Sequence, residues 1–429
     1  MTDFFASTRY QMKVDVPALD GALIFASGIA RHELERRDLD KYDHTSRRML
    51  DPQLYLSGLD VARAGKTCTK LASYGWFDGV AHAYESAKEK QANWRKSAVA
   101  DVKGSWTGQL PTDAKLIEDR VRTCIDLQKN LECEAIILPT PLIVVAGNDF
   151  SLQLEWLDAG LKLAARMAPG LPRLATIALS DTCVRGIDPW SSSALETLLD
   201  QFSARGAEGV YVVIEQASHE HLYESNANTL GTLIRLVRDF RASGIRRIVV
   251  PLAGVAGLLG AAVGAEVWST GWYRSERRLR LSEFEDSDEQ RMSIPTYYSH
   301  LLAGEIHLKT DLDTINAGGL LSLVADQTPA SEGLLLALRS GHVVASVAPW
   351  EARKSNVAAA KEHFVTALLR ETHRMRALAV DQRFDAAKRW LDNAIGVAAK
   401  ISSLGDFHDR TALGHQRAWR SVLERAAAA

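Results

Sequence analysis

Short, continuous runs of apolar residues alternate along much of the chain with segments whose apolar residues recur at helical spacing. A run that is apolar at successive positions indicates a strand buried on both faces, which is typical of parallel strands covered by helices. Seven such runs are present, at residues 21–26, 53–57, 135–138, 174–179, 210–214, 247–250 and 266–269.

Amphipathic segments at 152–167, 193–205 and 229–243 separate the later runs, and each ends near a glycine or a proline, as helices commonly do. The spacing between successive runs is long enough for right-handed βα crossovers. With an eighth strand expected between residues 60 and 130, the pattern predicts an α/β fold of the (β/α)8 TIM-like barrel type. An open doubly wound sheet is the structural alternative, because spacing alone does not show whether the sheet closes.

The last part of the chain has a helical pattern in which residues such as Phe364, Leu368, Trp390 and Ile395 can line apolar faces. We therefore expect a barrel over residues 1–310, with an N-terminal extension and a charged insertion near 282–294 that forms a loop over one mouth. A C-terminal helical region is expected over 311–429.

The composition of the 429 residues, 46% hydrophobic and 24% charged, excludes a collagen-like or wholly disordered chain. The uncharged stretch 249–265 approaches the length of a membrane span, but Pro251 and four glycines divide it into a short strand, a loop and a small-residue helix. We expect no membrane segment. The first residues lack a charged region followed by an apolar one, and the four cysteines form no CxxC pair, so we expect a cytoplasmic protein without a disulfide framework.

Charge is unevenly distributed, because residues 353–429 hold 14 Lys and Arg against 8 Asp and Glu. A basic helical segment on an acidic body suits contact with nucleic acid or another acidic partner. The alternative is a set of solvated or packed helix faces. We favour packing on the barrel or on a second subunit, because the segment pairs apolar stripes with only a modest net charge.

A phosphate site is predicted at the last two strands. In barrels such a site is often formed by the loops after these strands, where glycines let backbone N–H groups approach phosphate oxygens. Gly254 and Gly271 stand at these positions, and Tyr273 and Arg274 follow as further substrate-binding candidates. The nearby basic residues Arg277, Arg278 and Arg280 can add positive charge. The alternative is that the glycines serve close helix–sheet packing and the arginines are solvated.

Two carboxylates, Asp181 and Glu215, fall at predicted carboxyl ends of neighbouring strands, where barrels place their chemistry. If one of them is desolvated, its pKa rises and the pair can perform general acid–base catalysis. The alternatives are a helix N-cap for Asp181 and a buried ion pair for Glu215. The pair His219 and His221 lies several residues beyond a strand, which favours a surface position, so no metal ligand is predicted.

The segment Arg48-Met49-Leu50-Asp51, which leads into a predicted strand, resembles the start of the catalytic barrel of tRNA-guanine transglycosylases. In that family an aspartate-containing turn precedes the base pocket. The Ser-Gly-Gly that usually follows is Pro52-Gln53-Leu54 here, and the family's Cys/His zinc site is absent. The resemblance implies base exchange on a nucleic acid as one alternative function.

The sequence therefore predicts a barrel enzyme, a transferase, lyase or hydrolase, that acts on a phosphate-bearing small molecule or nucleotide. It identifies no cofactor and leaves a homo-oligomer open. One alternative is a nucleic-acid-modifying barrel that uses residues 274–280 and the basic helices as a phosphate track. Another is a catalytically silent barrel that serves as a protein-interaction scaffold.

Overall fold

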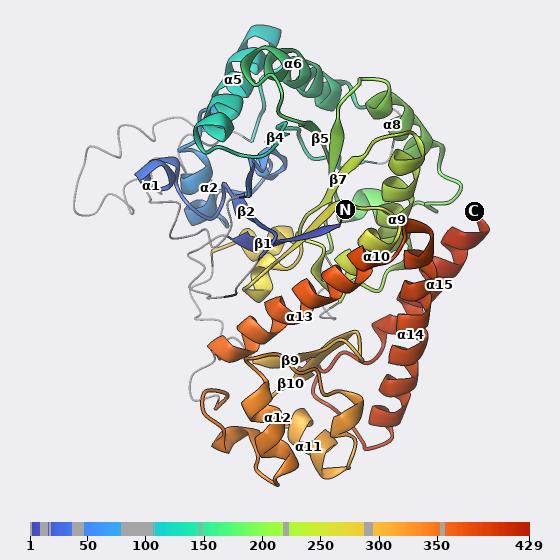
Figure 1. Ribbon diagram of the computed structural model, residues 1–429. Helices are drawn as coiled ribbons and strands as arrows, with labels where there is room; N and C mark the ends of the chain where they lie inside the picture. The colour runs from blue at the N-terminus through green and yellow to red at the C-terminus, as the bar shows by residue number, and fades with distance from the viewer. Residues whose placement is uncertain are drawn as a thin grey trace.

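Eight parallel strands form one sheet at the centre of the computed structural model, in the order β3-β2-β1-β8-β7-β6-β5-β4 (Figure 1). The structure describes residues 2–8, 16, 19–36, 47–78, 106, 108–145, 147, 149–217, 223–286, 295–351 and 357–429. The strands are β1 Asp3–Thr8, β2 Gly21–Phe25, β3 Arg48–Asp51, β4 Ile136–Ile137, β5 Arg173–Leu179, β6 Gly209–Ile214, β7 Arg247–Val250 and β8 Val267–Gly271.

The two edges of this sheet meet, because the backbone N–H of Glu134, just before β4, donates to the carbonyl of Arg48 in β3 at 3.0 Å. The strands alternate with helices along the chain: α1 Arg31–Arg36, α2 Gly65–Leu71, α5 Ala114–Asn130, α6 Ser151–Met167, α7 Asp181–Arg185, α8 Ser193–Ser203, α9 Ala227–Ala242 and α10 Gly257–Ala262. The predicted (β/α)8 barrel is confirmed, and the open doubly wound sheet is excluded by the contact between β3 and β4.

Two strand predictions are wrong. The apolar run at 53–57 is not a strand, because β3 ends at Asp51, Gln53 adopts a left-handed backbone with φ of 53°, and Leu54–Leu56 form the 3-10 turn η2. The turn is apolar because all three of its residues are buried. The eighth strand, expected between 60 and 130, is β1 near the start of the sequence; the described part of that interval contains helices α2 and α5 instead.

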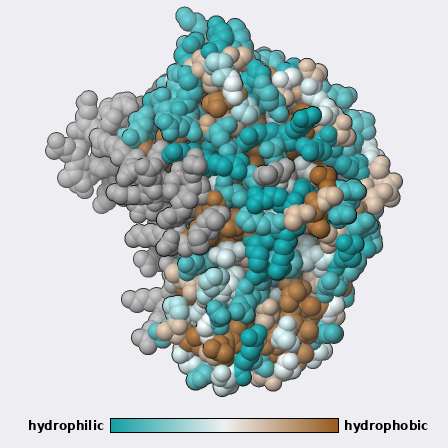
Figure 2. Space-filling view, in the orientation of Figure 1, coloured by the Kyte–Doolittle hydropathy of each residue, from teal (hydrophilic) through white to brown (hydrophobic). Residues whose placement is uncertain are grey.

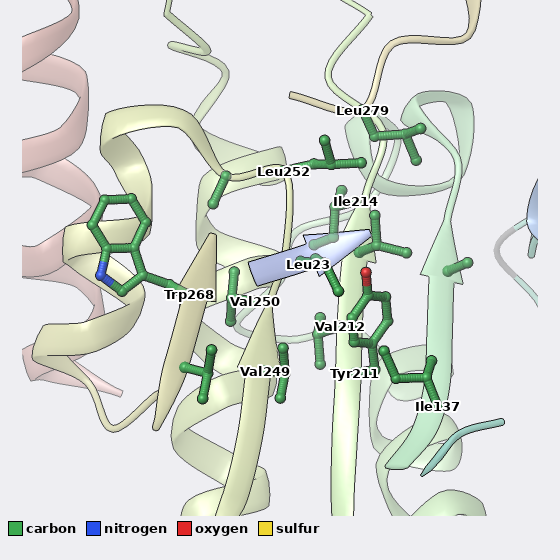
Figure 3. Packing of buried hydrophobic residues seen from close by; sticks show 14 of the residues in the cluster. Leu23, Ile137, Tyr211, Val212, Ile214, Val249, Val250, Leu252, Trp268 and Leu279 are labelled. Atoms are coloured by element: carbon green, nitrogen blue, oxygen red, sulfur yellow. The ribbon is translucent and has the colours of Figure 1, made fainter. Parts of the chain in front are cut away.

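The barrel interior is filled by side chains from several strands (Figure 3). Leu23 of β2, Ile137 of β4 and Tyr211 of β6 are fully buried there. Leu252 and Leu279, which follow β7 and β8, lie toward the carboxyl ends of the strands. Because the interior is packed, a ligand site has to lie at the rim of the barrel, where the connecting loops emerge.

The C-terminal region consists of an antiparallel hairpin and five helices: β9 Thr296–Ser299, β10 Gly304–His307, α11 Asp311–Ala317, α12 Glu332–Arg339, α13 Ala358–Ala377, α14 Val380–Ser402 and α15 His415–Ala428. The charged insertion expected near 282–294 begins with the 3-10 turn η7, Leu281–Phe284, and its residues 287–294 lie outside the described residues, so its place over the barrel mouth stays a prediction. A second hydrophobic core, with members from Tyr297 to Ile401, joins the hairpin to α11 and α12. The division at residue 310 stays a prediction.

Helices α13, α14 and α15 pack against the barrel, as expected (Figure 1). Phe364, Leu391, Trp419 and Leu423 are at most 1% exposed and belong to the same hydrophobic core as the barrel strands. Trp268 of β8 lies on the outer side of its strand (Figure 3), where its indole N–H donates to the Thr372 hydroxyl of α13 at 3.1 Å. The apolar stripes of the C-terminal helices are therefore core positions.

Several basic residues of this segment form ion pairs within the molecule. Arg376 contacts Asp3 at 2.9 Å and Asp20 at 3.3 Å, while Arg425 contacts Asp188 at 2.8 Å. These contacts use acidic groups of the barrel to neutralise part of the positive charge of residues 353–429.

The stretch 249–265 folds as predicted into β7, the 3-10 turn η5 at Gly254–Ala256 and the short helix α10. Within the described parts of the chain, no helix has the length and apolar character needed to cross a membrane. The visible face is mostly hydrophilic, with apolar patches at the end of the molecule formed by α11 and α12 (Figure 2).

Candidate functional site

A cavity of about 30 Å³ lies where the carboxyl ends of β6, β7 and β8 meet the C-terminal region. The barrel side of its wall consists of Gln216, Tyr223 and Glu224 after β6, residues 253–256 after β7, and Arg274, Arg277 and Arg278 after β8. The opposite side is formed by Glu305 of β10, Phe364 of α13 and Trp419 of α15. The volume accommodates about two water molecules, so a larger ligand requires the wall to adjust.

The sharp turn after β8 brings the arginines to the cavity. The 3-10 turn η6, Arg274–Glu276, folds back onto the end of β8. A Cβ atom at Gly271 would lie only 2.0 Å from the Cβ of Glu276, so this close return requires glycine. Gly271 is thus explained by packing within its own turn.

The chain then runs along the ends of β6 and β7. The backbone N–H of Gln216 donates to the carbonyl of Leu279 at 2.8 Å, and that of Gly254 donates to the carbonyl of Arg277 at 2.7 Å. Leu279 is fully buried. This backbone pairing fixes residues 277–279 over the rim of the barrel and places the side chains of Arg277 and Arg278 at the cavity wall.

Arg277 and Arg278 are two largely desolvated positive charges. The Arg277 side chain is 13% exposed, lies over the ring of Phe364 at 3.6 Å and forms an ion pair with Glu305 at 2.6 Å. Burial lowers the pKa of Arg278 below its ordinary value, and repulsion by Arg280 lowers it further. An anion beside these guanidinium groups would reduce the cost of burying them.

The predicted carboxylates Asp181 and Glu215 contact each other through one backbone group, since the N–H of Asp181 donates to the Glu215 carboxylate at 3.0 Å. Arg185 joins them to the cavity, because it contacts Asp181 at 2.5 Å and the cavity residue Glu224 at 3.1 Å. Burial raises the pKa of Glu215. Ser180, rather than Asp181, caps helix α7 with its side chain.

Of the four predicted substrate-binding residues, Gly254 and Arg274 lie on the cavity wall. Gly254 has a left-handed backbone with φ of 56°, and its N–H is already bonded to the Arg277 carbonyl, so that group is engaged within the protein. The ring of Tyr273 lies 4.0 Å from the ammonium group of Lys361. The roles of these residues, and of Asp181 and Glu215, stay predictions.

Sequence reasoning missed the residues that face the arginines. Glu305 belongs to a hairpin that closes the cavity from the other side, and Trp419 comes from a helix near the end of the chain. Their part in the site arises only from tertiary packing, so no local motif points to them. Glu224, in contrast, follows β6 and could have been found by extending the search beyond Glu215.

Asp51, the aspartate of the transglycosylase resemblance, is enclosed within the barrel. Its carboxylate accepts hydrogen bonds from Tyr55 at 2.7 Å, from Tyr211 at 2.6 Å and from the backbone of Gln53 at 2.9 Å. Burial raises the pKa of Asp51 to about 6. Asp51 is not part of the cavity wall, and its described contacts join β3 to β6.

The two histidines weighed as metal ligands, His219 and His221, lie outside the described residues.

Comparisons of this chain with protein-family models, with curated proteins and with solved structures found no match. The class that the structure defines is therefore a (β/α)8 barrel with a C-terminal helical extension, and its function has to be inferred from the site.

Proposed function

We propose that this protein is a barrel enzyme that binds a phosphate-bearing small molecule or nucleotide in the cavity at the ends of β6, β7 and β8. The observation that carries the proposal is the convergence of Arg274, Arg277 and Arg278 on one cavity wall. Guanidinium groups offer paired N–H donors that match phosphate oxygens. Loops after the last two strands are also a frequent place for phosphate in this fold.

Chemistry at this site would draw on the adjacent carboxylates. A buried carboxyl group with a raised pKa, such as Glu215, is suited to proton transfer closer to neutral pH than an ordinary glutamate. Arg185 forms ion pairs with both Asp181 and the cavity residue Glu224. A bound anion that alters the charge at the cavity wall would therefore affect Asp181 through these two ion pairs. Transferase, lyase and hydrolase chemistry are all compatible with this arrangement.

Nucleic-acid modification and a silent scaffold are less well supported. Arg277 is largely buried and paired with Glu305, so it offers no exposed track for a phosphate backbone, and several basic residues of the C-terminal helices are paired internally. The cavity wall holds three arginines and the carboxylates of Glu224 and Glu305. Burying charged groups costs free energy, and a protein-interaction scaffold has no need of such a cluster.

Isothermal titration calorimetry with inorganic phosphate, ribose 5-phosphate and adenosine monophosphate tests the proposal. At least one phosphate compound is expected to bind, and Arg274→Gln is expected to raise its Kd by roughly tenfold or more, since a hydrogen bond to a charged group contributes about 1.5–3 kcal/mol. Arg339→Gln, at an exposed residue at the end of α12, is the matched control and should leave the Kd unchanged. Absence of binding, or equal effects of the two variants, would contradict the proposal.

A further inference from the structure

A carboxylate of the protein itself already neutralises one arginine of the cavity. One Glu305 oxygen forms the 2.6 Å ion pair with Arg277 and also accepts a hydrogen bond from the Thr296 hydroxyl. The other oxygen accepts a hydrogen bond from the Tyr223 hydroxyl at 3.0 Å. The Glu305 side chain is only 3% exposed, so both oxygens are held away from solvent.

The surrounding structure fixes both partners of this ion pair. The guanidinium carbon of Arg277 lies over the Phe364 ring, 3.6 Å from its centroid, so the ring packs against this side chain while the guanidinium N–H groups form hydrogen bonds. Glu305 is held through its own backbone, because its carbonyl accepts the N–H of Ala412 at 3.0 Å and β10 pairs with β9. The contact is thus part of the cavity architecture and differs from a mobile surface pair.

We infer that Glu305 is a specificity-determining residue that occupies the place of the ligand's anionic group beside Arg277 and restricts binding to phosphate dianions. This inference rests on the proposed function. A ligand that brings only a carboxylate would replace the Glu305–Arg277 contact with an equivalent one and would gain little binding free energy. A phosphate dianion brings a second charge and a third oxygen, which Arg274 and Arg278 on the same wall can bind.

Competition between Glu305 and the ligand also explains why a small cavity can accept a phosphate group. Once the ligand neutralises Arg277, the Glu305 oxygen that contacts both Arg277 and Thr296 can move away, while the other oxygen keeps its hydrogen bond to the Tyr223 hydroxyl. The site thereby exchanges one anion for another and leaves no buried arginine without a counter-charge, which would be costly.

The decisive variant is Glu305→Gln, which preserves the size of the side chain and removes its charge. Calorimetric titrations with inorganic phosphate and with acetate, at about pH 8 where phosphate is largely a dianion, should show both anions binding more tightly than to the wild type. We expect the affinity for phosphate to rise about tenfold and that for acetate to rise more, so that the selectivity for phosphate over acetate falls. Glu155→Gln, at an exposed residue of α6 that is not on the cavity wall, is the matched control and should change neither affinity.

Thr296→Val provides a second test if Glu305→Gln fails to fold. This variant weakens the hold on Glu305 without removing its charge, and it should raise the phosphate affinity by a smaller factor, about twofold to fivefold. If the wild type binds phosphate through Arg274 but the Glu305 and Thr296 variants that fold keep its affinity and selectivity, the inference is wrong and the proposed function stands. If neither the wild type nor any folded variant binds phosphate, both are wrong.

Discussion

Asp51 shows how a single buried carboxyl group influences the stability of the whole barrel. Two tyrosine hydroxyls and one backbone N–H donate to it, and these hydrogen bonds favour its charged form. Complete burial acts in the opposite direction and is the larger effect, so the pKa rises from 3.8 to about 6. The folded protein therefore binds a proton here more tightly than the unfolded chain does.

This difference predicts a specific pH dependence. The stability that protonated Asp51 contributes is fully present below about pH 4 and is lost as the pH rises through about 6, because the folded pKa is raised. Asp51→Asn should remove this loss, so the free energy of unfolding of the wild type relative to the variant should fall by roughly 2 kcal/mol between pH 4 and 7. Urea denaturation of both proteins across this range measures the difference. Two parallel stability curves would contradict the pKa assignment.

At the scale of the individual element, helix α15 combines packing with a place in the cavity wall. Leu423 is fully buried in the core shared with the barrel, whereas Arg417 on the same helix is exposed. Trp419 donates its indole N–H to the Glu224 carbonyl at 2.8 Å and thereby joins α15 to the loop after β6. The helix should therefore be essential for stability.

The matched pair Leu423→Ala and Arg417→Ala tests this role. Removing the buried leucine side chain should lower the free energy of unfolding by about 2–5 kcal/mol, while the exposed change should cost less than about 0.5 kcal/mol. Chemical denaturation and size-exclusion chromatography measure stability and assembly. Similar, small effects of both substitutions would mean that α15 does not pack on the barrel in solution.

Elements were predictable from sequence where burial and periodicity agree. The continuous apolar runs that become β2 and β4 to β8 are buried on both faces, toward the packed interior and toward the covering elements, so hydrophobicity alone identified them. The same rule failed at Leu54–Leu56, because a buried 3-10 turn is as apolar as a buried strand. It also failed at β1, where Asp3 and Ser7 interrupt the apolar pattern although every residue of the strand is buried.

At the scale of the whole molecule, the two ends of the barrel have different tasks. Opposite the cavity, at the amino ends of the strands, Arg47 bridges Asp3 and Glu134 with contacts of 2.7 Å, and Glu134 also pairs with Arg247. This network links β1, β3, β4 and β7 around the closure of the sheet. Charged groups at this end of a barrel usually serve stability, and those at the carboxyl end serve function.

Glu134→Gln should therefore separate stability from binding. We expect the free energy of unfolding to fall by about 1–3 kcal/mol, because two arginines lose a shared counter-charge, while the Kd for inorganic phosphate stays unchanged. Glu208→Gln, which affects the more exposed pair with Arg173 at the same end, is the control and should cost less than about 1 kcal/mol. A change in phosphate affinity in the Glu134 variant would show that the two ends are coupled.

The candidate site could be predicted only in part, because some of its residues come from the packing of the C-terminal region against the barrel. Gly254 and Arg274 were recognisable because they follow predicted strands, and the position of strand ends in a barrel is fixed by the fold. Glu305 and Trp419 join the cavity through the C-terminal region, whose placement depends on packing between surfaces far apart in sequence. Such contacts leave no periodic or local signal in one sequence.

The position of β1 has a consequence for the synthesis of the protein. β1 lies between β2 and β8, and its residue Asp3 is in register with Val267, about 260 positions further along the chain. At a synthesis rate of about 5–20 residues per second, β8 is synthesised roughly 13–50 seconds after β1, and one edge of β1 is unpaired during this time. Isolated parallel strands are unstable and their open edges invite pairing with other chains. A nascent chain would therefore carry one unpaired edge of β1 until β8 has been synthesised, and we expect a chaperone that binds this edge early to reduce aggregation during synthesis.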